Sequence, residues 1–233
     1  MEVKNLIIIT GCPRSGTSMV AGSINKCGAF GGKMNGPNRN NKKGMFENHK
    51  IISSMVKPFL KKLNVDPMGQ YPLPKTDSLQ TPHYWKSSFL KVFKEEGFRK
   101  GSIMYKDPKI GLLWPIWYDC FPEAKWVIVR RKTDDIVDSC LKTGFMRAFH
   151  HSFIQKEVGV MSEAEGWEWW VNQHLGRFEA MKEKIQFKEI WPEKMVYGDY
   201  SELMATIKWL GLEWNSDVLS FIDPMLWKSR QKI

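Results

Sequence analysis

The sequence lacks several features that would place it in a specialised class. Its four cysteines (Cys12, Cys27, Cys120 and Cys140) include no C-x-x-C pair of the kind that binds metal, and four would make a sparse disulfide framework for 233 residues. No stretch approaches the ~18 consecutive apolar residues that a membrane-spanning helix requires. The N-terminal residues also lack the pattern of a signal peptide. We therefore expect a cytoplasmic protein with reduced cysteines and no association with a membrane.

A lysine is missing from the most informative motif. The segment Gly11–Ser18 (GCPRSGTS) matches the phosphate-loop pattern G-x-x-x-x-G-K-[ST] except that Thr17 replaces the lysine. The segment follows a short apolar run, Val3–Thr10, that predicts a buried strand, and it precedes a predicted helix, Thr17–Cys27. A tight turn at a helix N-terminus presents backbone N–H groups to an anion. The predicted anion contacts are Arg14, Ser15, Gly16, Thr17 and Ser18.

Acidic residues are fewer than basic ones, 25 against 35, which gives a net charge of +10. This excess favours anionic partners such as nucleic acid, phosphorylated cofactors or acidic polymers. The basic residues are spread along the chain and accompany no nucleic-acid recognition motif, so we expect no nucleic-acid partner. The basic segment Gly31–Gly44 (GGKMNGPNRNNKKG) is predicted to be a loop, either a plain solvated one or one that contacts the acceptor of a reaction.

Strand and helix patterns alternate along the chain. Further strands are predicted at Ser102–Lys106 and Lys125–Arg130, with a last one at Met195–Tyr197. Thr133 is expected to cap a helix, and Ser162 with Glu165 to form the capping box of another. The alternation predicts an α/β fold in which a P-loop-like parallel β-sheet is flanked by helices on both faces. No linker divides the sequence, so residues 1–233 are interpreted as one domain.

A second possible anion site occurs in WVIVRRKTDDIVDSC. Arg131 falls at the end of a predicted strand, and Ser139 lies eight residues later in the following helix. The carboxyl ends of parallel strands and the helices that follow them line one edge of a sheet. We therefore expect Arg131 and Ser139 to lie near the first loop. Only the spacing favours Arg131 over its neighbour Arg130.

Together these segments resemble the sulfotransferases that use 3′-phosphoadenosine 5′-phosphosulfate (PAPS). Pro13–Ser18 (PRSGTS) is similar to the family's 5′-phosphosulfate loop, and the spacing from Arg131 to Ser139 is similar to its 3′-phosphate motif. Lys43–Asn48 (KGMFEN) and Lys106–Pro115 (KDPKIGLLWP) resemble the bacterial and tyrosylprotein-type branches. The resemblance covers about residues 7–141 and implies the sulfotransferase form of the nucleoside-triphosphate-hydrolase-like fold.

The resemblance implies transfer of a sulfuryl group from PAPS to an acceptor hydroxyl or amine, with release of adenosine 3′,5′-bisphosphate and without a metal. Arg14, Thr17 and Ser18 would hold the phosphosulfate, and Arg131 with Ser139 the 3′-phosphate. Lys106, like Arg14, would supply positive charge during the transfer. Glu47 is the candidate base, with His49 as its rival.

Several assignments stay open at this point. The stripe of Trp167, Trp170, His174, Phe178 and Met181 predicts a buried helix face, whereas Trp169 points elsewhere and is a candidate for stacking on the adenine or the acceptor. Residues Leu226–Arg230 (LWKSR) are interpreted as a solvated basic tail. The acceptor can be a small molecule, glycan, lipid or peptide. A P-loop kinase and a non-catalytic binder of PAPS-like or polyanionic ligands are the alternative functions.

Overall fold

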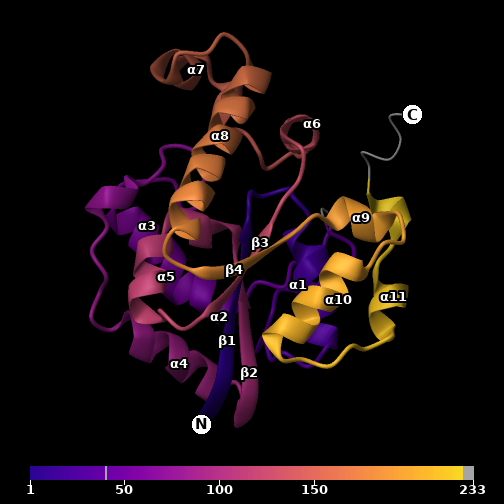
Figure 1. Ribbon diagram of the computed structural model, residues 1–233. Helices are drawn as coiled ribbons and strands as arrows, with labels where there is room; N and C mark the ends of the chain where they lie inside the picture. The colour runs from indigo at the N-terminus through magenta and orange to yellow at the C-terminus, as the bar shows by residue number, and fades with distance from the viewer. Residues whose placement is uncertain (40, 228–233) are drawn as a thin grey trace.

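The computed structural model describes residues 1–39 and 41–227, and within them a four-stranded parallel sheet lies between two groups of helices (Figure 1). The order across the sheet is β2-β1-β3-β4, so β1 is a central strand. This arrangement confirms the predicted α/β fold with helices on both faces. The strands are β1 (Glu2–Gly11), β2 (Lys100–Lys106), β3 (Lys125–Val129) and β4 (Gln186–Ile190).

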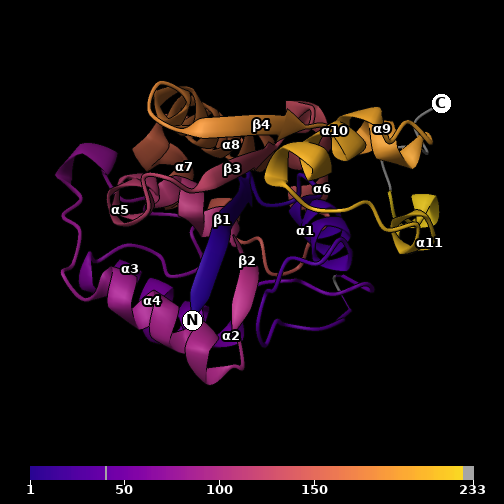
Figure 2. The same cartoon turned by 60° about the horizontal axis from the view of Figure 1, so that its bottom comes forward.

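Alternation along β1 builds two separate apolar cores. Leu6 and Ile8 contribute to the core on one face of the sheet, and Ile7 and Ile9 to the core on the other. Figures 1 and 2 show the helices that cover each face. The smaller core is covered by α1 (Thr17–Lys26), α10 (Ser201–Leu210) and α11 (Asp217–Phe221), and the larger by α4 (Trp85–Glu95), α5 (Trp114–Cys120) and α8 (Glu163–Lys182).

Helix α8 presents the predicted aromatic stripe to the larger core. Trp167, Trp170, His174, Phe178 and Met181 are each no more than 1% exposed, which confirms the prediction of a buried face. The ring of His174 lies between its neighbours in the stripe, with its centroid 4.3 Å from that of Trp170. Burial of this stripe anchors α8 along the sheet, next to the end of β3 from which the candidate site is built.

The remaining elements connect these layers. A nearly continuous helical segment has a π-helical turn in its middle, and shorter helices follow β3 and β4. No helix in the described part of the chain is long and apolar enough to cross a membrane. These elements are α2 (His49–Ile51), η1 (Ile52–Val56), α3 (Lys57–Lys62), η2 (Thr76–Ser78), η3 (Pro108–Leu112), α6 (Thr133–Leu141), η4 (Ala148–His150), α7 (Ser152–Val158), α9 (Pro192–Val196) and η5 (Pro224–Leu226).

Two local predictions are wrong. The last strand is β4 rather than Met195–Tyr197, since Pro192 occupies the first position of α9, where a proline fits a helix well. Thr133 is the first residue of α6 and does not cap it; Lys132 holds the cap position without a side-chain hydrogen bond. The cap at Ser162 is confirmed, because its Oγ accepts from the Glu165 backbone N at 3.2 Å.

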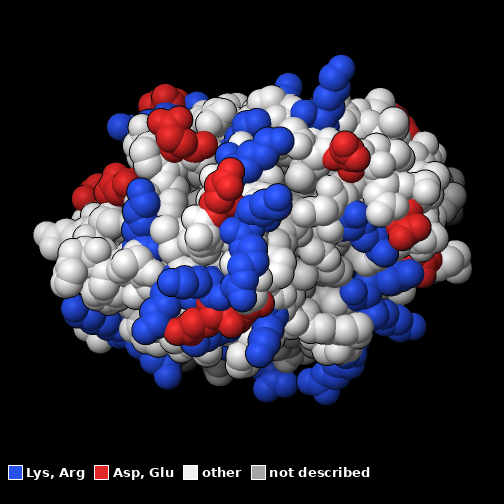
Figure 3. Space-filling model, turned by 90° about the horizontal axis from the view of Figure 1, so that it is seen from below, with Lys and Arg blue, Asp and Glu red and all other residues white. Residues whose placement is uncertain are grey.

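Basic side chains also occur away from the carboxyl ends of the strands. Figure 3 shows the lower face of the molecule, toward which the N-terminus of β1 points in Figure 1. Lys and Arg side chains cover much of this face, and Asp and Glu side chains lie among them. The net positive charge of the protein is therefore not confined to one site.

Candidate active site

Three adjacent strands end beside one cavity. β1 leads into the loop before α1, β3 leads into Arg131, and β2 ends at Lys106. Because these strands are parallel neighbours, their carboxyl ends bring together residues that are far apart in the sequence. The cavity has a volume of about 620 Å³, and its lining includes Arg14, Gly16, Thr17, Ser18, Glu47, Lys106, Arg131 and Ser139.

The loop between β1 and α1 has the backbone geometry of an anion cradle. Arg14 and Gly16 have positive φ angles of 74° and 93°, and Gly16 holds the N-cap position of α1. Such angles reverse the chain tightly, and the first N–H groups of a helix have no acceptor within it. Thr17 and Ser18 begin the helix and line the cavity, whereas the Ser15 side chain is fully buried beneath the loop.

Two arginines join this loop to the end of β3 and the helix α6. Arg14 Nε donates to Ser139 Oγ at 3.0 Å, and Arg131 Nη1 donates to the Arg14 carbonyl oxygen at 2.5 Å. Arg131 thus lines the cavity together with its predicted partner Ser139. Arg130, in contrast, forms ion pairs with Glu179 and Glu189 outside the cavity, at 3.4 and 3.1 Å.

Both arginines are partly buried, and burial opposes their charged form. Among the described residues no carboxylate forms an ion pair with Arg14, and burial lowers the pKa of its guanidinium. Burial also lowers the pKa of Arg131, against an opposing contribution from Asp135. The nearby thiols stay neutral, since burial raises the pKa of Cys140 to about 12. An anion in the cavity would offset the cost of burying this charge.

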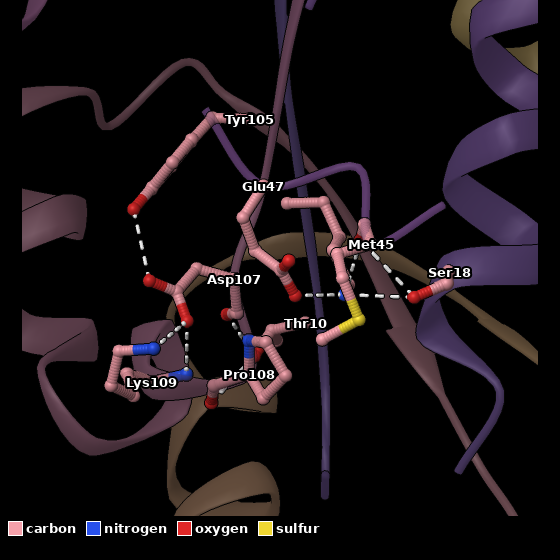
Figure 4. A network of polar contacts seen from close by, with 9 residues as sticks. Thr10, Ser18, Met45, Glu47, Tyr105, Asp107, Pro108 and Lys109 are labelled. Carbon is pink, nitrogen blue, oxygen red and sulfur yellow. Dashed lines mark hydrogen bonds and ion pairs between the residues drawn. The ribbon is translucent and has the colours of Figure 1, made fainter. Parts of the chain in front are cut away.

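Lys106 connects the loop to the predicted base. Its Nζ donates to Glu47 Oε1, to the Met45 carbonyl oxygen at 2.9 Å and to Ser18 Oγ at 3.2 Å. Figure 4 shows Glu47, Met45 and Ser18 converging on this point. The side chains of Lys106 and Glu47 are only 2% and 7% exposed. One ammonium group therefore joins the end of β2 to the segment that carries Met45 and Glu47 and to the start of α1.

Asp107 fixes the backbone that carries Lys106. Its carboxylate is fully buried and accepts from the Tyr105 hydroxyl at 3.1 Å and from the Lys109 backbone N at 2.9 Å (Figure 4). Lys109 Nζ adds an ion pair at 2.8 Å. Burial raises the pKa of Tyr105, so its hydroxyl keeps the proton that it donates. The turn after β2 is consequently rigid where Lys106 leaves the strand.

Two predicted site residues lie elsewhere. His49 is exposed, and its Nδ1 is hydrogen-bonded to Asn35 Oδ1 at 3.2 Å. The Trp169 ring packs against Tyr71 and Phe149, with centroid distances of 5.9 and 6.1 Å. Neither residue lines the cavity. The geometry therefore favours Glu47 over His49 as the base and gives no support to stacking by Trp169.

The sequence analysis missed one residue of the cavity. Trp227 is 6% exposed, and the Arg131 guanidinium carbon lies 4.3 Å from the centroid of its ring. A Cβ atom on Gly16 would lie 2.9 Å from the same ring, so Trp227 also covers the loop before α1. The prediction of a solvated tail is thus wrong for Leu226 and Trp227, while residues 228–230 lie outside the described part of the chain. No local sequence pattern signals this contact, because it joins residues 96 positions apart, Arg131 and Trp227.

Several solved structures that resemble this chain in fold are sulfotransferases. One from Alicyclobacillus acidocaldarius has a TM-score of 0.57 and 13% identity, covering 98% of this chain and 90% of its own. The sulfotransferase domain from the curacin biosynthetic pathway has a TM-score of 0.56 and 12% identity, with coverages of 96% and 79%. Sulfotransferase STF9 from Mycobacterium avium has a TM-score of 0.52 and 14% identity, with coverages of 100% and 70%. No protein-family model and no curated protein matches the sequence. The chain therefore has the fold of these sulfotransferase structures.

Proposed function

We propose that the protein is a sulfotransferase that moves a sulfuryl group from PAPS to an acceptor hydroxyl or amine. The observation that carries this proposal is the placement of two anion-binding groups in one cavity. The loop before α1 suits the 5′-phosphosulfate, and Arg131 with Ser139 suits the 3′-phosphate. The 3′-phosphate is the group that distinguishes PAPS from ATP.

The lining of the cavity fits such a ligand. It contains partly buried arginines, hydroxyl groups and the N-terminus of α1, all of which bind oxyanions. Arg14 contacts Ser139 directly, so the subsites for the two ends of the ligand adjoin each other. When bound, PAPS would supply a sulfuryl group on a phosphate leaving group.

The residues around Lys106 provide the two functions that transfer needs. The acceptor oxygen forms a bond to sulfur while the bond from sulfur to the bridging phosphate oxygen breaks. Glu47 is placed to take the acceptor proton, because its Oε2 accepts no hydrogen bond from another described residue. Lys106 is placed to stabilise the departing oxygen, since its ammonium also reaches Ser18 at the start of α1.

A P-loop kinase remains the alternative for the same fold. In that class a lysine of the loop contacts the terminal phosphates of the nucleotide. Here Thr17 occupies that position, and the nearest cationic groups are Arg14 within the loop and Lys106 from β2. The arrangement favours the sulfuryl-transfer proposal, and no observation specifically favours the kinase.

Comparison of two sulfate donors tests the proposal. Transfer of labelled sulfate to a panel of hydroxyl and amine acceptors would be measured with PAPS and with adenosine 5′-phosphosulfate, which lacks the 3′-phosphate. We expect transfer from PAPS to be strongly preferred, and Arg131→Ala to remove most of that preference. Equal use of both donors by the unmodified protein, or Mg²⁺-dependent phosphoryl transfer from ATP instead, would contradict the proposal.

A further inference from the structure

The cavity holds more positive charge than the proposed PAPS contacts use. Besides Arg14, Lys106 and Arg131, its lining includes six cationic side chains: Lys142 at the end of α6, and five from three other segments. Three come from the basic loop of residues 31–44, one from the start of α3 and one from the turn after β2. These five, called the acceptor-side cations below, are Arg39, Lys42, Lys43, Lys57 and Lys109.

Most acceptor-side cations are not neutralised within the described part of the chain. The side chains of Arg39, Lys42 and Lys57 form no ion pair or hydrogen bond with another described residue, and Lys43 Nζ lies 5.9 Å from the centroid of the Phe221 ring. Only Lys109 has a carboxylate partner, Asp107. Like charges gathered around one cavity repel each other, so this arrangement carries an electrostatic cost that a bound anion would relieve.

Acidic side chains of the lining lie on other segments. Asp135 and Asp138 belong to α6, where Asp135 is close enough to Arg131 to raise its pKa, and Asp223 precedes η5. The remaining acidic residue of the lining is Glu47, which follows the basic loop. It is already paired with Lys106. The five acceptor-side cations therefore come from other segments than the acidic side chains of α6 and the residue before η5, whereas Lys142 lies at the end of α6 itself.

The basic loop ends at the predicted catalytic pair. Lys42 and Lys43 come shortly before Met45, whose carbonyl oxygen accepts from Lys106 Nζ. The loop is pinned there by two backbone bonds, from Asn35 N to the Glu47 oxygen at 2.8 Å and from Met45 N to the Asn35 oxygen at 3.0 Å. An acceptor molecule whose hydroxyl reaches Glu47 would therefore lie beside the cations of this loop.

We propose that the acceptor is an anion: a compound that carries a carboxylate, phosphate or sulfate group near the hydroxyl or amine to be sulfated. This inference rests on the proposed sulfuryl transfer and narrows its substrate class. A neutral acceptor would displace water from three or more cations without replacing the hydrogen bonds that these cations donate to the water. An anionic acceptor pairs with them in a partly enclosed cavity, where charge interactions are stronger than in bulk water.

The test uses binding to the protein already saturated with adenosine 3′,5′-bisphosphate. Thermal unfolding would be followed with two pairs of probes that differ in charge. One pair is a hyaluronan tetrasaccharide and the uncharged tetra-N-acetylchitotetraose; the other is an acidic tyrosine-containing peptide and its Asn/Gln counterpart. We expect at least one anionic member to raise the melting temperature while its neutral counterpart does not, and the responding pair distinguishes a saccharide from a peptide.

Charge-reversal variants locate the effect. Lys42→Glu and Lys57→Glu should each weaken binding of the anionic probe by roughly tenfold or more, since each replaces an attraction by a repulsion. Lys62→Glu is the matched control: Lys62 is an exposed residue of the same helix as Lys57 and does not line the cavity. It should bind the probe like the unmodified protein, although basic side chains elsewhere (Figure 3) attract anions weakly.

Three outcomes would overturn the inference. They are equal shifts from both members of each pair, no shift from any anionic probe, and equal loss in Lys62→Glu and Lys57→Glu. Failure of the proposed sulfuryl transfer is seen separately, because it would appear as absence of stabilisation by adenosine 3′,5′-bisphosphate itself. That first step is measured before any acceptor probe is added.

Discussion

At the scale of single residues, replacing both members of the Lys106–Glu47 pair is expected to affect stability and the proposed catalysis differently. Both side chains are almost completely buried, so both charged groups have lost nearly all contact with water. Removing one partner leaves an uncompensated buried charge, which typically costs about 3–5 kcal/mol. Exchanging both for neutral groups of similar volume avoids most of that cost. Stability and turnover can therefore be separated by mutation.

We predict that Lys106→Met lowers the free energy of unfolding by about 3 kcal/mol or more, since Glu47 then stays buried without its partner. The double variant Lys106→Met/Glu47→Gln should recover most of that stability, yet remain inactive, because both proposed catalytic groups are gone. Urea unfolding and sulfate transfer would be measured on the same preparations. Full turnover in Lys106→Met would rule out its proposed role in stabilising the leaving oxygen.

A second buried residue makes stability depend on pH. His174 is 1% exposed, and burial lowers its pKa to about 4. The unfolded chain binds a proton near the ordinary histidine pKa of about 6.5, so protonation favours unfolding. The stability that neutral His174 provides is fully present above about pH 6.5 and is lost as the pH falls toward about 4.

We predict that His174 contributes about 3 kcal/mol to the fall in unfolding free energy between about pH 6.5 and 4. His174→Leu has a side chain of similar volume without a titrating group. The variant should therefore show a flatter dependence over this window, measured as the difference between the two proteins in urea unfolding at several pH values. Parallel curves for the two proteins would show that His174 is not the group responsible.

Residue patterns predicted much of the candidate site but not all of it. Arg14, Thr17, Ser18 and the Arg131–Ser139 pair belong to local motifs with fixed spacing, and the parallel sheet brings both motifs to one edge. Trp227 was out of reach, because its position over Arg131 depends on how the last segment returns across the loop before α1. The same holds for the burial of Glu47 against Lys106, which joins segments 59 residues apart.

At the scale of elements, helix α8 depends on a close contact with η4. A Cβ atom on Gly166 would lie 2.5 Å from the ring atoms Cγ and Cδ1 of Phe149 and 2.8 Å from its Cβ. The Phe149 ring is fully buried and packs edge-on against Trp167, with a centroid distance of 4.8 Å, so it has no room to withdraw. Gly176 lies on the same helix with open space where a Cβ would be.

We predict opposite effects of adding a methyl group at these two glycines. Gly166→Ala should lower the free energy of unfolding by about 1–3 kcal/mol through overpacking. Gly176→Ala should raise it by about 0.5–1 kcal/mol, because alanine is the better helix former. Denaturant unfolding of the two variants checks both signs. Stabilisation by Gly166→Ala would mean that α8 and η4 are not packed this closely.

The start of α8 was predicted correctly, because Ser162 caps the helix as its spacing from Glu165 indicated. The last strand was misplaced because β4 (QFKEI) lies at the edge of the sheet and alternates between exposed and partly buried residues. Its apolar content is consequently low. The more apolar segment around Met195 and Val196 belongs instead to a short helix.

At the scale of the whole molecule, the charge excess has two components. Figure 3 shows basic side chains with acidic neighbours on the lower face, toward which the N-terminus of β1 points in Figure 1. The cavity at the other end gathers arginines and lysines from the loop before α1, the basic loop, α3 and the ends of β2 and β3. Net charge alone predicted an anionic partner, whereas the fold gathers many cationic side chains around a cavity of defined shape. Binding there should therefore depend on where the ligand carries its phosphates.

Thermal unfolding with adenosine 3′,5′-bisphosphate, compared with ATP and Mg²⁺, tests the central claim most directly. At about a hundredfold excess over Kd, binding to one site adds ~2.7 kcal/mol of stability. For a chain of this size that corresponds to a rise in melting temperature of roughly 5–10 °C. The account predicts this rise with the bisphosphate, its loss in Arg131→Ala, and little change with ATP and Mg²⁺. A rise with ATP and Mg²⁺ alone would contradict the account and support a kinase instead.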